Sequence, residues 1–238
     1  MRNIAVIGSS GAIGRAMIER LSSLYPAAAV SAFSRTSQTF VNPQIKSYKI
    51  NYDSELAISQ AADAASQLAP LDLVFVATGK LHDQNHMPEK SIRDLSSSKF
   101  LDMFMTNTVI PAIIAKHFIP KLETDRPATF AALSARVGSI SDNYLGGWYS
   151  YRASKAALNM VIKNLAIETA RKRKLATIVS MHPGTVESDL SKPFQASVPP
   201  DKLFTPAYAA ERLCQVLVNL SPEQTGKCFA WDGNEIEP

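Results

Sequence analysis

An apolar run, a glycine-rich turn and an amphipathic run follow one another directly near the start of the chain. Residues 2–7 are mostly apolar, the turn is Gly8-Ser9-Ser10-Gly11-Ala12-Ile13-Gly14, and residues 15–21 space their apolar side chains as a helix does. Glycines in such a turn let a pyrophosphate approach the backbone at the positive N-terminus of the helix. The pattern predicts a dinucleotide-binding unit in which the turn residues Gly8, Ser10, Gly11, Ile13 and Gly14 contact the cofactor.

Strand-like and helix-like patterns alternate along the rest of the chain. The expected strands are residues 27–33, 45–50, 71–76, 129–133, 175–181 and a short one near 229, and the expected helices are residues 54–68, 97–118, 148–172 and 206–219. Such alternation favours parallel βαβ units over an antiparallel meander. We therefore expect an α/β fold: a single doubly wound Rossmann domain over residues 1–238, with a mainly parallel seven-stranded sheet and helices on both faces.

The helix that starts near Trp148 carries a tyrosine and a lysine four residues apart. Side chains at i and i+4 lie on one face of a helix, so Tyr151 and Lys155 can face the same pocket. An ammonium near a phenol lowers the pKa of the phenol and makes it a usable proton donor or acceptor near neutral pH. The alternative is a half-buried tyrosine beside a solvated lysine, which any helix can hold.

The second expected strand ends in Ser34-Arg35, where doubly wound folds contact the adenosine ribose. An acidic residue there accepts hydrogen bonds from the 2′-hydroxyl, whereas an arginine pairs with a 2′-phosphate. No Asp or Glu lies between Arg20 and Asp53. The pattern favours NADP over NAD, with Ser34 and Arg35 as phosphate contacts, and the alternative is an exposed loop arginine.

Other polar residues follow the ends of neighbouring expected strands or interrupt an apolar helix. Ligands of such sheets bind beyond the carboxyl ends of the strands, so Asn51, Tyr52 and Ala77-Thr78-Gly79 should join the same crevice. Asn107 is a polar residue in an apolar helix and needs a partner. Pro111 predicts a kink in that helix. We expect a mobile lid over the crevice at residues 188–205.

Composition excludes several other classes of protein. The net charge of +4 comes partly from the basic run 171–174, which is more typical of a solvated helix end than of a nucleic-acid interface. No signal peptide and no apolar run of bilayer length is present, so we expect a cytoplasmic protein without a membrane partner. Cys214 and Cys228 are expected as buried thiols, and His82 and His86 as loop histidines without a metal site.

The motifs Gly8-x-x-Gly11-x-x-Gly14, Asn107, Tyr151-x-x-x-Lys155 and Pro183-Gly184 stand in an order and spacing that resemble the short-chain dehydrogenases/reductases. The stretches 139–155 and 230–233 are similar to the C-factor and sniffer-type carbonyl reductase branch. The resemblance covers nearly the whole chain. It implies an NADP-dependent oxidoreductase that reduces a small carbonyl compound, or oxidises the alcohol in reverse, and that forms a homodimer or homotetramer through the helices around Asn107 and Tyr151.

The resemblance also implies roles for individual residues. Tyr151 would exchange a proton with the carbonyl oxygen, Lys155 would lower the pKa of Tyr151 and hold the nicotinamide ribose, and Asn107 would anchor a water. Residues 77–79 would line the adenosine ribose. The nicotinamide would be bordered by Pro183, Gly184, Val186 and Ser188.

Departures from the family pattern concern the catalytic serine above all. The family has Ser-Ser where this chain has Ser134-Ala135, and Ala135 falls at the expected serine position. A shift of one residue along a strand turns a side chain to the other face, unless a bulge presents Ser134 to the substrate. Ser134 is the expected third catalytic residue if such a bulge presents its hydroxyl. The alternatives are a cofactor-binding regulatory protein with weak or vestigial catalysis and an epimerase-like enzyme.

Overall fold

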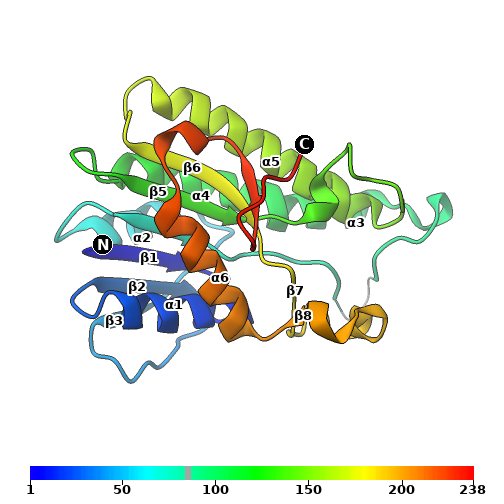
Figure 1. The fold of residues 1–238 in the computed structure, drawn as a ribbon, viewed down its shortest axis with the longest axis horizontal. Coiled ribbons are helices and arrows are strands. Elements are labelled where there is room, and N and C mark those ends of the chain that lie inside the picture. Colours follow the sequence, from blue (N-terminus) through cyan, green and yellow to red (C-terminus); the bar gives the residue numbers. More distant parts are fainter. Residues whose placement is uncertain (84–86) are drawn as a thin grey trace.

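A parallel β-sheet lies between two layers of helices in the computed structural model, which describes residues 1–83 and 87–238 (Figure 1). Within these residues the main sheet has seven strands in the order β3-β2-β1-β4-β5-β6-β9, and every neighbouring pair is parallel. The strands are β1 (Asn3–Ile7), β2 (Ala29–Ser34), β3 (Ile45–Lys49), β4 (Leu73–Val76), β5 (Ala128–Leu133), β6 (Ala176–His182) and β9 (Cys228–Ala230). The predicted doubly wound, mainly parallel seven-stranded sheet is confirmed.

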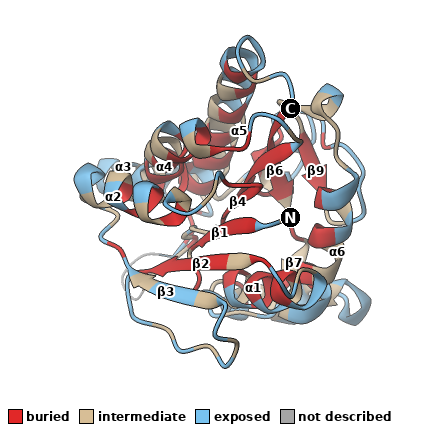
Figure 2. Cartoon of the chain, turned by 90° about the vertical axis from the view of Figure 1, so that its left-hand side faces the viewer, coloured by how far each residue is buried: buried red, intermediate tan, exposed pale blue. Residues whose placement is uncertain are grey.

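Helices cover both faces of the sheet because successive strand residues point to opposite sides (Figure 2). Ile4 and Val6 of β1 pack with α1 and α6, while Ala5 and Ile7 pack with α2, α4 and α5. The helices are α1 (Ala12–Leu24), α2 (Glu55–Ser66), α3 (Ser97–Phe104), α4 (Ile110–Phe118), α5 (Tyr149–Ala170) and α6 (Pro206–Asn219). Short 3₁₀ helices are η1 (Ile92–Asp94), η3 (Ile119–Lys121), η4 (Arg136–Gly138), η5 (Lys192–Ser197), η6 (Pro200–Lys202) and η7 (Pro222–Gln224).

The expected helix 97–118 is interrupted before its proline. A π-helical segment, η2 (Met105–Val109), separates α3 from α4, and the N–H of Ile110 bonds to the carbonyl of Met105 five residues back. Pro111 has no N–H to donate to the carbonyl of Asn107, so the helix widens one turn upstream of it. Instead of a kink at Pro111, the structure has this π-helical turn at residues 105–109, around Asn107.

A second, two-stranded sheet was not expected from the sequence. β7 (Thr185–Val186) and β8 (Leu203–Phe204) pair in parallel, and the segment between them carries η5 and η6. Gly184 makes this pairing possible: its φ is +79°, and a Cβ there would lie 2.5 Å from the ring of Phe204. The β7–β8 pair thus holds the two ends of the segment 187–202 side by side.

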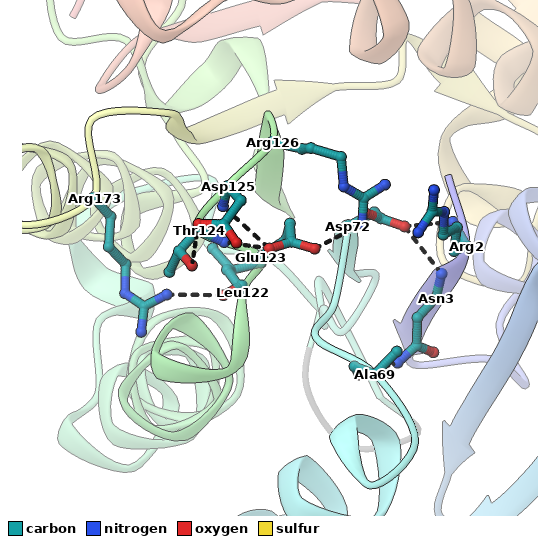
Figure 3. A network of polar contacts seen from close by, with 10 residues as sticks. All are labelled: Arg2, Asn3, Ala69, Asp72, Leu122, Glu123, Thr124, Asp125, Arg126 and Arg173. Carbon is teal, nitrogen blue, oxygen red and sulfur yellow. Dashed lines mark hydrogen bonds and ion pairs between the residues drawn. The ribbon is translucent and has the colours of Figure 1, made fainter.

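The amino ends of the strands carry a network of paired charges (Figure 3). Asp72, buried just before β4, accepts the backbone N–H groups of Arg2 and Asn3. Arg126 bridges Asp72 at 3.4 Å and Glu123 at 2.6 Å, and its hydrogen bond is the main cause that lowers the pKa of Glu123 to about 2. This edge of the sheet is held by satisfied polar groups.

Candidate active site

A cavity of about 740 Å³ opens at the carboxyl ends of β1, β4, β5 and β6. It lies where open α/β sheets bind their ligands, at the edge opposite the Asp72 network. Its wall combines the glycine turn, the starts of the loops after β4 and β5, the first turns of α5 and the segment after β6. The predicted site residues that line it are Ser10, Gly11, Ile13, Gly14, Ala77, Thr78, Gly79, Ser134, Tyr151, Lys155, Pro183, Gly184, Val186 and Ser188.

The three glycines of the first turn are required for different reasons. Gly8 has a φ of +87° and packs against the backbone of Ala77, where a Cβ would lie 2.8 Å from the carbonyl carbon. A Cβ on Gly14 would lie 2.2 Å from the oxygen of Gly8, so only glycine permits this close crossing. Gly11 is exposed to the cavity, and a Cβ there would meet nothing closer than 3.5 Å. The fold does not need glycine at position 11, whereas a ligand that approaches the backbone does.

Tyr52 supports the glycine turn from beneath and does not line the cavity. Its hydroxyl accepts the N–H of Gly8 at 3.1 Å and donates to the carbonyl of Phe33 at 3.3 Å. Burial raises the pKa of Tyr52 to about 12. Gly8 likewise lies behind the turn and outside the cavity lining. Both residues shape the turn through the backbone, so a direct cofactor contact by Tyr52 is not what this geometry provides.

The residues expected at the ribose end lie outside the cavity lining. Ser34 is buried and its hydroxyl donates to the carbonyl of Thr36 at 2.6 Å. Arg35 is exposed at the end of β2, with its side chain in solvent. Asn51 is exposed and accepts the N–H of Asp53 at 3.0 Å. The structure therefore leaves Arg35 available to an anion but gives Ser34 and Asn51 local partners.

Tyr151 and Lys155 are brought together in a buried wall of the cavity. The Lys155 Nζ lies 5.9 Å from the centroid of the Tyr151 ring and donates to the carbonyl of Leu133 at 2.9 Å. Burial raises the pKa of Tyr151 to about 12 and lowers that of Lys155 to about 8. The expected lowering of the Tyr151 pKa is not found: the shift of this pKa is upward, and its cause is the desolvation of the phenolate by burial.

Asn107 is buried behind the cavity, and its side chain forms hydrogen bonds within the protein. Its Oδ1 accepts the N–H of Lys80 at 2.8 Å, and its Nδ2 donates to the carbonyl of the same residue at 2.8 Å and to the hydroxyl of Ser154 at 3.1 Å. These bonds fasten the loop after β4 to α5. The polar residue in the apolar helix has thus found its partners, and it does not line the cavity itself.

Ser134 and Ala135 both reach the cavity, since β5 ends at Leu133 and the chain turns. The hydroxyl of Ser134 is buried without a hydrogen-bond partner among the described residues. Ala135 packs with Tyr151 in a small apolar cluster. Ser134 therefore lines the same cavity as Tyr151 with its hydroxyl buried, and the alanine at the expected serine position is the residue that contacts Tyr151.

His182 belongs to this site and was missed by sequence reasoning. It lines the cavity at the end of β6, and its Nδ1 is buried without a partner in the part of the chain that the structure describes. Burial lowers its pKa to about 4, so the ring is neutral at pH 7. Thr78, Ser134 and His182 follow three neighbouring strands and carry three unpartnered polar atoms. The position of His182 directly before Pro183-Gly184 was the signal in the sequence that could have identified it as a cavity residue.

Aromatic rings close the cavity over Tyr151. The Trp148 ring lies 6.2 Å from that of Tyr151 and 4.9 Å from that of Phe194, which belongs to η5. Phe194 also contacts His82 at 5.8 Å. The His82 Nε2 bonds to the carbonyls of Asp189 at 3.2 Å and Leu190 at 3.1 Å. The loop after β4 and the segment after β7 therefore meet above the tyrosine.

Other predicted features concern metals, thiols and membranes. His86 lies outside the described residues, and no group of three His, Cys, Asp or Glu side chains among residues 1–83 and 87–238 could hold a metal ion. Cys214 and Cys228 are buried free thiols, as predicted. No helix in the described part of the chain is both long and apolar enough to span a membrane.

Comparison with known proteins places this geometry in a family. The model of the short chain dehydrogenases matches residues 2–198. C-signal of Myxococcus xanthus is 28% identical over 146 residues, which are 61% of this chain and 82% of that protein. The carbonyl reductase Sniffer of D. melanogaster has the same fold, with a TM-score of 0.87, 23% identity and 100% coverage of both chains. The NADPH-bound carbonyl reductase from chicken fatty liver gives 0.86, 22% identity and coverage of 100% and 99%. The chain belongs to the short-chain dehydrogenase family and is an oxidoreductase of that type.

Proposed function

We propose that the protein is an NADP-dependent reductase of small carbonyl compounds. The observation that carries this proposal is the pairing of Tyr151 and Lys155 in one wall of the cavity whose other wall is the Gly11 turn. One wall offers a buried proton and an ammonium, and the other offers a backbone open to a phosphate. A carbonyl substrate between them would meet both parts of the reaction.

The cavity fits a nicotinamide dinucleotide. Gly11 leaves the turn open at the N-terminus of α1, and Thr78, Ser134 and His182 line the same cavity, each with a buried polar atom that has no partner within residues 1–83 and 87–238. We assign its binding to the glycine turn, residues 77–79, Lys155 and residues 183–188. A bound nicotinamide supplies the hydride.

Arg35 supports NADP as the preferred dinucleotide. It is exposed at the end of β2, next to the turn, and no carboxylate precedes Asp53 after Arg20. A guanidinium there can pair with a 2′-phosphate, whereas nothing in this stretch accepts hydrogen bonds from a free ribose as a carboxylate does. Titration with NADPH and NADH should give the lower Kd for NADPH.

Tyr151 acts as the proton donor. Because burial raises its pKa to about 12, the hydroxyl stays protonated at pH 7 and is ready for the carbonyl oxygen. The Lys155 ammonium stabilises the negative charge that remains on the tyrosine oxygen after transfer. Ser134 donates a second hydrogen bond to the carbonyl oxygen from the end of β5.

Residues 188–205 act as the lid of this cavity. Leu190 and Phe194 from this segment join the apolar cluster around Tyr151, and the return strand β8 anchors its far end. Excluding water strengthens the interaction of Lys155 with the tyrosine oxygen and prevents loss of the proton to solvent.

Replacing Tyr151 by Phe tests the assignment. We expect Tyr151→Phe to abolish NADPH oxidation with a panel of aldehydes, ketones and quinones and to leave the Kd for NADPH nearly unchanged, because only the hydroxyl is lost. Tyr149→Phe is the matched control: Tyr149 is 38% exposed on the same helix turn, and it should keep full turnover. Unchanged turnover in Tyr151→Phe would overturn the assignment.

Ala135 favours a second candidate, a cofactor-binding regulatory protein with weak catalysis. An alanine occupies the expected serine position and packs on Tyr151, and C-signal is among the relatives. This candidate predicts tight NADPH binding without turnover on the carbonyl panel. A gain of turnover in Ala135→Ser would then identify the missing hydroxyl as the reason.

We also propose that the protein forms a homodimer or homotetramer. Leu101, Met105 and Val109 are exposed at helical spacing along α3 and η2, and Met160 and Ile167 are exposed on α5, which packs beside α3. Exposed apolar side chains on adjacent helices favour burial against another copy. Sedimentation equilibrium should give twice or four times the chain mass, and a monomer would contradict this assembly.

A further inference from the structure

Glu89 is a buried carboxylate that the proposed reaction leaves unused. It is 1% exposed, lies in the loop after β4, and does not line the cavity. Its Oε1 has no hydrogen-bond partner among the described residues. Burying a carboxylate is unfavourable unless the charge is stabilised nearby, so its surroundings should explain its presence.

Glu89 holds the start of α5 from 61 residues away. Its Oε2 accepts the N–H of Ser150 at 3.3 Å, and its backbone carbonyl accepts the N–H of Trp148 at 2.5 Å. The helix has no side-chain cap of its own at Trp148. The first N–H groups of a helix need such acceptors, and a negative charge is favourable at this end of the helix dipole.

The chain that Glu89 holds has an unusual backbone. Gly146 and Gly147 each have a φ of +64°, and Trp148 follows with a φ of +50°, the only positive value outside glycine among the described residues. Left-handed backbone disfavours a bulky residue and persists only when neighbouring contacts impose it. Arg152 supplies further contacts, since its Nε donates to the carbonyls of Gly146 at 3.2 Å and Gly147 at 3.1 Å.

This imposed conformation decides where the Trp148 ring lies. Its left-handed backbone directs the ring between Tyr151 and Phe194, at 6.2 and 4.9 Å from their centroids. Tyr151 lies in the first turn of this helix, directly after Ser150, whose N–H the Glu89 carboxylate accepts. The same clamp thus sets the helix start, the aromatic wall of the cavity and the seat of the lid.

We propose that Glu89 is a positioning residue: by clamping Trp148 and Ser150 it fixes the Tyr151 hydroxyl in the cavity and gives Phe194 of the lid a surface on which to close. The role of Tyr151 rests on the proposed function, whereas the position of the Trp148 ring does not depend on it. Reactions that need atoms held in place lose about 10²-fold in rate for a displacement of about 1 Å.

Two variants of Glu89 and one control separate position from charge. Glu89→Ala removes the acceptor, and Glu89→Gln keeps an acceptor of the same size without the charge. We expect kcat to fall about 10- to 100-fold in Glu89→Ala and less in Glu89→Gln, with the Kd for NADPH within about twofold because the glycine turn is untouched. Glu168→Gln, an exposed change on the same helix, should leave both values unchanged.

Trp148 fluorescence gives a readout that does not depend on turnover. The chain has two tryptophans, so Trp231→Phe leaves Trp148 as the single reporter. In this background Glu89→Ala should increase acrylamide quenching of Trp148, and Glu168→Gln should not. Absence of carbonyl turnover in the parent protein would remove the proposed function, while the quenching result would still judge the clamp.

Particular outcomes would overturn the proposal. A folded Glu89→Ala variant with unchanged kcat and unchanged quenching would show that the carboxylate positions nothing. If Glu89→Ala does not fold, Glu89→Asp decides, because its shorter side chain withdraws the acceptor from Ser150 and keeps the charge: wild-type kcat and wild-type quenching together would overturn the clamp.

Discussion

The two edges of one sheet treat their polar groups in opposite ways. At the amino edge, Asp72, Glu123 and Arg126 pair with one another or with backbone N–H groups (Figure 3). At the carboxyl edge, Ser134 and His182 carry buried polar atoms without partners in the described part of the chain. Satisfied polar groups stabilise a fold, whereas buried polar groups without partners do not, so their presence beside a cavity needs an explanation in function.

From this difference we expect substitutions at the amino edge to reduce stability and substitutions at the carboxyl edge to reduce function. A group with fixed partners leaves them unpaired when it is removed, so its loss appears in the free energy of unfolding. A group without a partner leaves nothing behind in the unliganded protein, so its loss appears in binding or turnover. Three experiments test this contrast between the two edges.

Removing Asp72 should give the largest effect on stability. Asp72→Ala leaves Arg126 and two backbone N–H groups without their buried acceptor, which should lower the free energy of unfolding by about 3 to 5 kcal/mol. Asp63→Ala is the control, because Asp63 pairs with Lys121 at the surface and should cost less than about 1 kcal/mol. Urea denaturation measures both, and equal losses would end the contrast.

Two buried serines on neighbouring strands give an intermediate effect. Ser180 donates to Asn159 at 2.9 Å, so Ser180→Ala should lower the free energy of unfolding by about 1 to 2 kcal/mol. The Ser134 hydroxyl has no partner among the residues that the structure describes, so Ser134→Ala should change the free energy of unfolding by less than about 0.5 kcal/mol while reducing carbonyl turnover. Loss of stability without loss of turnover in Ser134→Ala would contradict its assignment to the site.

Protonating Glu123 at the amino edge should have the smallest of the three effects on stability. The folded pKa of Glu123 is held at about 2, below the ordinary value of 4.5, so its stabilising contribution is complete above pH 4.5 and is lost as the pH falls towards 2. Melting temperatures measured between pH 6 and pH 2.5 should therefore fall less steeply below pH 4.5 in Glu123→Gln than in the wild type. Parallel curves would show that this pair contributes nothing.

Local patterns predicted the fold well because strands and helices leave periodic signals. The parallel order, the glycine turn and the Tyr151/Lys155 pair all followed from spacing along the chain. The break at residues 105–109 was misplaced because Pro111 marks a missing donor and not the turn that adjusts to it. The clamp of Glu89 on Trp148 joins residues far apart in sequence, so no local pattern contains it.

Cavity-lining residues were predictable where position along a strand decides them. Residues at strand ends reach the cavity, as Thr78 and Ser134 do. Ser34 also ends a strand, but its hydroxyl donates to a carbonyl in the loop that follows. The orientation of the side chain decides this, and the spacing of residues along the chain does not reveal it. The spacing of Tyr151 and Lys155 predicts a lowered pKa for the tyrosine, but spacing carries no information about burial, which raises this pKa to about 12.

The central place of β1 has a consequence for how the chain folds. Its partners are β2 and β4, and Asn3 meets Asp72 across 69 residues of chain. Contacts between distant residues form slowly, because the loop between them must first close. A nascent chain that has not yet reached residues 73–76 exposes one unpaired apolar edge of β1, which is a template for aggregation. The time that synthesis takes to pass from β1 to residues 73–76 therefore sets how long this edge stays open to other chains.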